Sequence, residues 1–143
     1  MSDGWIGVDL DGTLAEYLGW GDGKIGKPIP LMVKRVKEWL AQGQTVKIFT
    51  ARVGEPYFDG DSESSIIQEI RDWLEAVSLP RDLEITAIKD FKMIELWDDR
   101  CIQVVPNTGV SVKEYYIMPI FCECCDTMYG SMSERDKMHG DKQ

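Results

Sequence analysis

The chain has little histidine and no long apolar run, and each shortage excludes a class of protein. Its single histidine, His139, falls in a polar C-terminal stretch, so a serine or cysteine nucleophile that depends on histidine lacks a credible base. No stretch reaches the roughly 20 apolar residues of a membrane helix, and the N-terminus lacks a basic segment followed by an apolar signal region. We therefore expect a cytoplasmic protein with no membrane partner.

Cysteine and positive charge are also scarce. Three of the four cysteines are crowded between residues 122 and 125, unlike the dispersed framework of a small secreted fold, which favours reduced thiols. Zinc binding by these thiols is disfavoured because they do not supply the usual two Cys-x₂-Cys pairs. The net charge of −9 disfavours broad attraction to nucleic-acid phosphates but leaves room for a local basic pocket.

What the sequence does contain is an alternation of strand and helix patterns. β-rich runs at 5–8, 45–50, 83–88 and 93–97 alternate with helical patterns that begin near Leu31 and near Asp61 or Ser62. This order predicts an α/β fold, a Rossmann-like three-layer sandwich with a mainly parallel sheet flanked by helices. We expect one domain over residues 1–125, with further β structure at 102–105 and 110–118, and a flexible tail at 126–143.

Two acidic pairs stand where two of these strands are expected to end. Asp9 and Asp11 follow the first apolar run, and Asp98-Asp99 follows Met93–Trp97. Because ligands bind outside the carboxyl ends of parallel strands, the two pairs could converge on one site. Four carboxylates together cannot stay ionised and unpaired, so we expect them to hold a hard divalent cation, most simply Mg²⁺.

The run Asp9-Leu10-Asp11-Gly12-Thr13 resembles the motif of the haloacid dehalogenase superfamily, most of whose members are Mg²⁺-dependent phosphatases. Thr50, Lys89 and Asp98-Asp99 follow in the expected order at the ends of the next three strands, so the resemblance covers about the first 105 residues. Larger members insert a cap domain after the first or third strand. Only short stretches stand at these places here, which implies a capless, open site closed at most by the loop at 16–27.

The resemblance implies phosphomonoester hydrolysis through an aspartyl phosphate, and the residue types suit that chemistry. Asp9 would attack the phosphoryl group, and Asp11 would protonate the leaving oxygen and later take a proton from water. Mg²⁺ held by Asp9, the backbone carbonyl of Asp11 and a carboxylate of Asp98 or Asp99 would neutralise the charge. Gly12 allows the turn that brings both aspartates to one phosphate.

Further residues are expected to contact the substrate. Thr50 offers a hydroxyl and Lys89 an ammonium to the phosphoryl oxygens, and Lys92 is a rival for the lysine role. The planar fork of Arg52 suits a second part of a phosphorylated substrate. The substrate-binding set expected from the sequence is Gly12, Thr13, Ala51 and Arg52.

The substrate itself stays open, as does the oligomeric state. The runs Thr50-Ala51-Arg52 and Asp98-Asp99-Arg100 also resemble the 3′-phosphatase domain of polynucleotide kinases, so nucleotides and nucleic-acid 3′ ends join small metabolites as expected substrates. The alternative is a non-catalytic module that binds a phosphorylated ligand or a nucleic-acid end and retains the metal site. Asp11 speaks against that alternative, because binding alone needs no acid or base.

Overall fold

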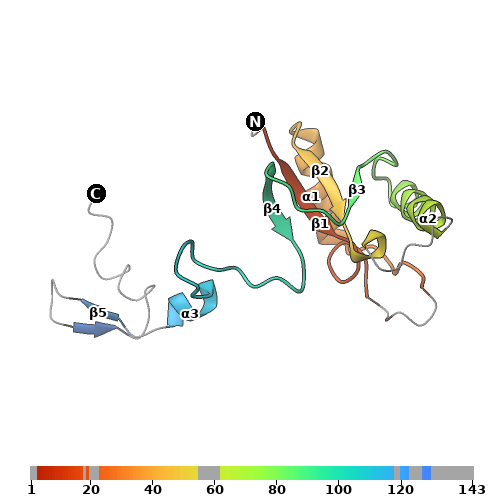
Figure 1. Cartoon of the computed structure of the whole chain (residues 1–143). Coiled ribbons are helices and arrows are strands. Elements are labelled where there is room, and N and C mark those ends of the chain that lie inside the picture. The colour runs from red at the N-terminus through yellow and green to blue at the C-terminus, as the bar shows by residue number, and fades with distance from the viewer. Residues whose placement is uncertain are drawn as a thin grey trace. The chain divides into compact units, whose positions relative to one another are not determined.

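A parallel four-stranded sheet organises the first part of the chain. The structure is a computed structural model that describes residues 3–17, 19, 23–54, 62–117, 120–122 and 127–129. The strand order is β3-β2-β1-β4, from β1 (Trp5–Asp9), β2 (Thr45–Phe49), β3 (Ile85–Thr86) and β4 (Met93–Trp97) (Figure 1). Helix α1 (Pro30–Ala41) connects β1 to β2, and α2 (Ser62–Ala76) connects β2 to β3. The predicted α/β class, a Rossmann-like parallel sheet flanked by helices, is confirmed.

The chain divides into two compact units, Met1–Asp99 and Arg100–Gln143. The first unit holds the sheet with α1 and α2. The second holds α3 (Val112–Ile117) and an antiparallel hairpin of β5 (Ile120–Cys122) and β6 (Thr127–Tyr129). The sequence instead predicts one domain over residues 1–125 and a flexible tail at 126–143. Of that predicted tail, only 127–129 lie within the described residues, and they form a strand.

The core of the first unit lies between the sheet and both helices. Ile6 pairs with Val46 and Val8 with Ile48 along β1 and β2, so these four side chains share one face of the sheet, and all are buried. The helices contribute buried side chains to the same cluster, namely Met32, Val33, Val36, Ile70 and Leu74. Period-two burial in the strands and helical spacing in α1 and α2 thus meet in one apolar interior.

The two long helices begin and end close to where the sequence indicates. Pro30 opens α1, where its missing N–H costs no hydrogen bond, and Gly43 follows the helix with a φ of +76°. In α2, Ile70 and Leu74 are fully buried, one helical turn apart. Ser62, one of the two residues near which the sequence predicts the start of this helix, begins α2, whereas the other, Asp61, lies outside the described residues.

The connection from β3 to β4 is short and carries no helix. β3 is shorter than the predicted run at 83–88, because the Ile88 N–H turns back to the Thr86 hydroxyl at 3.0 Å. The chain then returns to the amino end of the sheet, where the Trp5 Nε1–H bonds to Asp90 at 2.8 Å and the Trp5 N–H bonds to the Lys92 carbonyl at 2.9 Å. Neither this connection at 87–92 nor the one at 10–29 has room for a cap domain.

The second unit corrects two strand predictions. The predicted strand at 102–105 is wrong, since the structure gives only an isolated bridge between Val104 and Ser111. The predicted strand at 110–118 is also wrong, since α3 occupies it. A reciprocal cap starts that helix: the Ser111 N–H donates to the Glu114 carboxylate at 2.9 Å, and the Glu114 N–H donates to the Ser111 hydroxyl at 3.1 Å.

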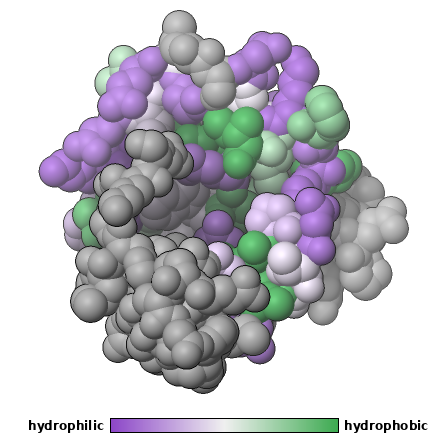
Figure 2. Space-filling view, turned by 90° about the vertical axis from the view of Figure 1, so that its left-hand side faces the viewer, coloured by the Kyte–Doolittle hydropathy of each residue, from purple (hydrophilic) through white to green (hydrophobic). Residues whose placement is uncertain are grey.

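Hydrophilic and apolar side chains both reach the surface of the described residues. Figure 2 shows apolar patches among hydrophilic side chains on one face. Among the residues that the structure describes, the large apolar side chains that are exposed are Tyr17, Leu31, Ile88, Phe91, Ile94, Ile102 and Val104. Within the described part of the chain, no helix is both long enough and apolar enough to cross a membrane.

Candidate functional site

The backbone register brings the ends of β1, β2 and β4 to one edge of the sheet. Asp9, the last residue of β1, pairs with Phe49, the last residue of β2, so Thr50 follows at the same level. The residue before Asp9 pairs with Trp97, so Asp98 comes level with Asp9 on the other side. Asp9 and the Asp98-Asp99 pair therefore converge as predicted, because parallel strands end at a common edge.

Three carboxylates gather at this edge. Asp9, Asp98 and Asp99 each offer an oxygen atom, and these atoms all lie within 4.8 Å of one another. Asp9 and Asp98 are half-buried, and Asp99 is exposed. An all-oxygen, negatively charged set of this kind fits a hard divalent cation such as Mg²⁺, which takes one or two carboxylates and completes its shell with water and substrate oxygens. The side chain of Asp11, expected in the same set, lies outside it.

The electrostatics of Asp9 reflect this crowding. Burial, followed by the negative charges of Asp98, Asp99 and Asp11, raises the pKa of Asp9 to about 7 from an ordinary 3.8. A bound cation would offset the same charges and favour the ionised carboxylate. Without a bound cation, the negative charges of these residues thus disfavour the approach of an anionic ligand to Asp9.

Gly12 and Thr13 hold the two acidic loops together. Gly12 has a φ of +97°, and a Cβ there would lie 2.7 Å from Asp99 Oδ2, so a side chain at this position would push the Asp99 carboxylate away from the turn. The Thr13 hydroxyl accepts the Asp99 N–H at 3.0 Å. The sequence analysis expected both residues at the substrate. The structure places both against Asp99, which they position.

Asp11 makes a bidentate ion pair with Arg52. The Arg52 Nε–H donates to Asp11 Oδ2 at 2.6 Å, and Nη2–H donates to Asp11 Oδ1 at 2.8 Å. The hydrogen bond to Asp11 raises the pKa of Arg52 above its ordinary value, so the guanidinium is charged at any working pH. The sequence analysis expected Arg52 to grip a second part of the substrate, whereas the structure directs its fork to Asp11.

A loop anchored on Arg52 is the part of the site that sequence reasoning missed. Arg52 Nη1–H donates to the Gly23 carbonyl at 2.5 Å and Nη2–H to the Lys24 carbonyl at 3.2 Å. The Trp73 Nε1–H of α2 donates to the Gly26 carbonyl at 2.9 Å and fixes the same segment. Backbone carbonyls accept these bonds, and every residue type has one, so the sequence contains no signal for them.

Thr50 and Ala51 lie where β2 ends and a short 3₁₀ turn, η1 (Ala51–Val53), begins. Thr50 is 1% exposed, and its hydroxyl accepts the Arg52 N–H at 3.2 Å. A threonine hydroxyl that accepts one bond still has a proton to donate. Ala51 is exposed, as the first residue of the turn. Both positions therefore lie at the carboxyl edge, as expected.

The two candidate lysines are separated by the β3–β4 connection. Lys89 is exposed, three residues beyond Thr86, where β3 ends. Lys92 directly precedes β4 at the amino end of the sheet, where its carbonyl bonds to Trp5. Asp9 lies four residues along β1 from Trp5, or roughly 13 Å at strand rise. Of the two lysines, Lys89 is the one whose backbone follows a carboxyl end.

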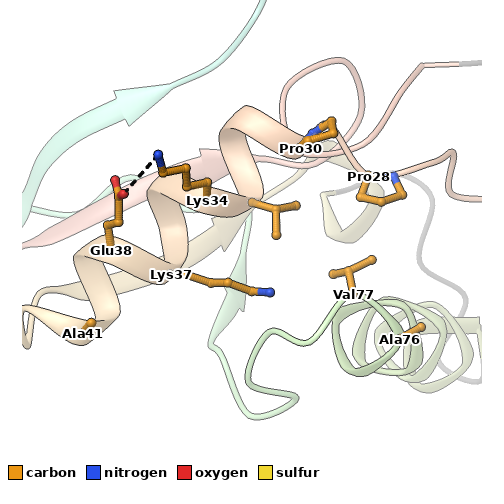
Figure 3. Close-up of a pocket in the computed structure, with 9 residues that line it drawn as sticks. Pro28, Pro30, Lys34, Lys37, Glu38, Ala41, Ala76 and Val77 are labelled. Atoms are coloured by element: carbon orange, nitrogen blue, oxygen red, sulfur yellow. Dashed lines mark ion pairs between the residues drawn. The ribbon is translucent and has the colours of Figure 1, made fainter.

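A separate groove of about 570 Å³ opens between α1 and α2 (Figure 3). It is lined by Pro28, Pro30, Val33, Lys34, Lys37, Glu38, Ala41, Ala76 and Val77. Lys37 extends from α1 toward α2, and Lys34 pairs with Glu38 at 3.8 Å (Figure 3). These lining residues include no nucleophile with a neighbouring base and no group of carboxylates, so the chemistry of the described residues is concentrated at the carboxyl edge.

Comparisons with known proteins support the fold. No protein-family model matches the chain, and no curated protein matches it. The fold is similar to the solved structure of a conserved protein from Bacteroides thetaiotaomicron, with a TM-score of 0.50 and 22% identity over 73% of this chain and 82% of that one. A likeness at this identity defines a class, the Rossmann-like α/β domain, and leaves the activity to be argued from the site.

Proposed function

We propose that the chain is a Mg²⁺-dependent phosphomonoester hydrolase of the haloacid dehalogenase type, which works through a phosphoryl group on Asp9. The observation that carries this proposal is the group formed by Asp9, Asp98 and Asp99, whose oxygens lie within 4.8 Å of one another beside the Asp11 turn. A carboxylate that lies among other carboxylates can attack an anionic phosphoryl group only if a cation neutralises the negative charge. A second aspartate two residues further along suits a reaction in which a proton is transferred.

The chemistry assigns a role to each residue. The Asp9 carboxylate attacks phosphorus and forms an aspartyl phosphate while the bond to the ester oxygen breaks. Asp11 gives its proton to that leaving oxygen, then takes one from the water that attacks the phosphorus and restores Asp9. Asp9, Asp98 or Asp99 and the Asp11 carbonyl would hold Mg²⁺, which would supply charge neutralisation for the phosphoryl oxygens.

Thr50 and Lys89 complete the proposed site. The Thr50 hydroxyl lies at the end of β2 and is available to donate to a phosphoryl oxygen. The Lys89 ammonium adds a positive charge on a flexible stem. With no cap domain, the site admits bulky substrates, and the proposed classes are nucleotides, nucleic-acid 3′ ends and small phosphorylated metabolites.

The test is turnover of phosphoesters by the purified chain with Mg²⁺ or with EDTA. p-Nitrophenyl phosphate, nucleotides, sugar phosphates and 3′-phosphorylated oligonucleotides form the panel. We expect hydrolysis with Mg²⁺, its loss in EDTA and its return when Mg²⁺ is added in excess. Comparing Asp98→Asn with Asp99→Asn should show which carboxylate binds the metal. The variant that lacks this ligand should lose about tenfold or more of the hydrolysis rate.

Asp82→Asn is the matched control, because Asp82 is an exposed aspartate in the loop before β3. It should leave the rate unchanged. Binding of a phosphorylated ligand without turnover of any ester would instead favour the alternative, a non-catalytic module that retains the metal site. Full activity in both Asp98→Asn and Asp99→Asn would contradict the proposed metal centre.

A further inference from the structure

We propose that Arg52 is a positioning residue, which holds the Asp11 carboxylate in the orientation from which it exchanges a proton with the leaving oxygen. This inference rests on the proposed function and deepens it. It replaces the role that the sequence suggests for Arg52, a grip on a remote part of the substrate.

The geometry of the ion pair supports positioning. Both fork atoms of Arg52 bond to Asp11, one to each carboxylate oxygen, at 2.6 and 2.8 Å. A bidentate pair fixes the plane of the carboxylate as well as its place. The side chains are only 8% and 13% exposed, so water and salt screen the pair weakly. Each Asp11 oxygen keeps a lone pair for a proton.

Arg52 is itself held from two directions. Its backbone N–H bonds to the buried Thr50 hydroxyl at 3.2 Å, which ties it to the end of β2. Its side chain reaches the Gly23 and Lys24 carbonyls of the loop that follows β1. These side-chain bonds engage all three nitrogen atoms of the guanidinium group. A substrate phosphate would have to displace protein acceptors in order to use this fork.

Arg52 also divides the four carboxylates between two roles. Asp9, Asp98 and Asp99 form the group that suits a cation, and the Asp11 side chain is outside that group. The ion pair with Arg52 holds the Asp11 side chain apart from that group. Without Arg52, the Asp11 carboxylate could turn toward a bound cation, where it would no longer serve as an acid and base.

The experiment compares two substrates that differ in their need for a proton. The leaving group of p-nitrophenyl phosphate is stable as an anion, whereas the alkoxide of an alkyl phosphate such as glycerol phosphate must be protonated as it leaves. We expect Arg52→Gln to lower kcat for the alkyl phosphate about tenfold more than for the nitrophenyl ester, with KM nearly unchanged. Asp11→Asn should show the same selectivity, and the double variant should be no worse than Asp11→Asn alone.

Three further measurements separate a positioning role of Arg52 from effects of charge or folding. Arg52→Lys keeps the charge without the fork and should recover only part of the alkyl phosphate rate. Arg81→Gln, which removes an exposed arginine paired with Asp72 and Glu75, should change neither substrate. A Mg²⁺-induced rise in Tm that persists in Arg52→Gln would show that the variant is folded with its metal site intact.

Two results would overturn this role while leaving the hydrolase intact. One is a rise in KM with equal losses on both substrates, which indicates a substrate grip. The other is full additivity with Asp11→Asn, which indicates that the two residues act separately. No turnover of either ester by the unaltered chain with Mg²⁺ would overturn the proposed function and the role of Arg52 together.

Discussion

At the scale of single residues, Gly12 shows how closely the site depends on one missing side chain. Its φ of +97° would strain any other residue, and a Cβ there would lie 2.7 Å from Asp99 Oδ2, so the Asp99 carboxylate would have to move aside. The motif contains this glycine for two reasons at once, a turn that needs a positive φ and a carboxylate that approaches the backbone. The sequence reveals the first reason, and only the fold reveals the second.

Gly12→Ala is therefore expected to displace Asp99 and weaken Mg²⁺ affinity by about tenfold or more. Strain at positive φ would add a stability loss of about 1 kcal/mol. Gly19→Ala is the matched control, because Gly19 also has a positive φ, +82°, but nothing within 4 Å of a Cβ. Calorimetric titration would measure the Mg²⁺ affinity of both variants. Equal affinity in the two variants would contradict the account of Gly12.

The raised pKa of Asp9 predicts a stability change that depends on pH. Below pH 3.8 Asp9 is protonated in both folded and unfolded chains. Between pH 3.8 and about 7 the unfolded chain releases this proton more readily, so the metal-free protein loses stability as the pH rises, and the loss is complete above pH 7. A shift of three units corresponds to at most about 4 kcal/mol, and solvent screening at this partly exposed group reduces it.

Asp9→Asn should therefore stabilise the metal-free protein by about 1–3 kcal/mol at pH 8 and by little at pH 4. Urea unfolding in EDTA at both values would measure this difference. Mg²⁺ should narrow the gap at pH 8, because the cation stabilises the folded state of the unaltered chain more than that of the variant. A difference that is the same at both pH values would contradict the raised pKa.

At the scale of elements, the buried side chains of α2 stabilise the core against which the sheet that carries the site is packed. Leu74 is fully buried in the cluster shared by the sheet and both helices. Leu74→Ala is expected to lower the free energy of unfolding by about 2–5 kcal/mol. Leu31→Ala on α1 is the control, since Leu31 is 57% exposed and should cost less than about 1 kcal/mol. Equal losses in denaturant titrations would contradict this packing.

The elements that hold the site are the ones that the sequence predicted well. β1, β2 and β4 are each marked by apolar runs that stop at polar residues, and α1 and α2 by helical spacing of buried side chains. The second unit was predicted poorly, because β-branched residues at 110–118 suggested a strand. The competing signal was present in Ser111 and Glu114, three residues apart, which cap α3.

The sequence likewise predicts one part of the candidate site and does not predict another. The convergence of Asp9 with Asp98-Asp99 follows from strand ends, which local sequence can locate. The pairing of Asp11 with Arg52 does not, because it joins residues 41 apart through the fold. The sequence also leaves both Lys89 and Lys92 as candidates for the lysine that contacts the phosphoryl group. The fold separates them, because the Lys92 carbonyl bonds to the Trp5 N–H at the amino end of the sheet.

At the scale of the whole molecule, charge governs how substrates approach. The net charge is −9, and Figure 2 shows hydrophilic side chains on one face. An anionic substrate is repelled over distances of a Debye length, about 10 Å at 0.1 M salt, so added salt should screen the repulsion. The residues proposed for catalysis all lie within one unit, Met1–Asp99.

We therefore expect KM for a small phosphate monoester to fall by about twofold to fivefold as KCl rises from 10 to 150 mM, with kcat nearly constant. Steady-state kinetics at fixed free Mg²⁺ would show this. A protein that attracts nucleic acid through a basic surface would show the opposite trend with a phosphorylated oligonucleotide. A KM that rises steeply with salt would contradict the repulsion inferred from the net charge.

The most direct test of the central claim is the rate of Asp9→Asn with an aryl phosphate and saturating Mg²⁺. The substitution keeps the shape of the side chain and removes its nucleophilic oxygen. Because the proposed mechanism passes through Asp9, it predicts that kcat falls on the order of 10³-fold or more. A variant that keeps most of the original rate would contradict an aspartyl phosphate at Asp9 and the mechanism built on it.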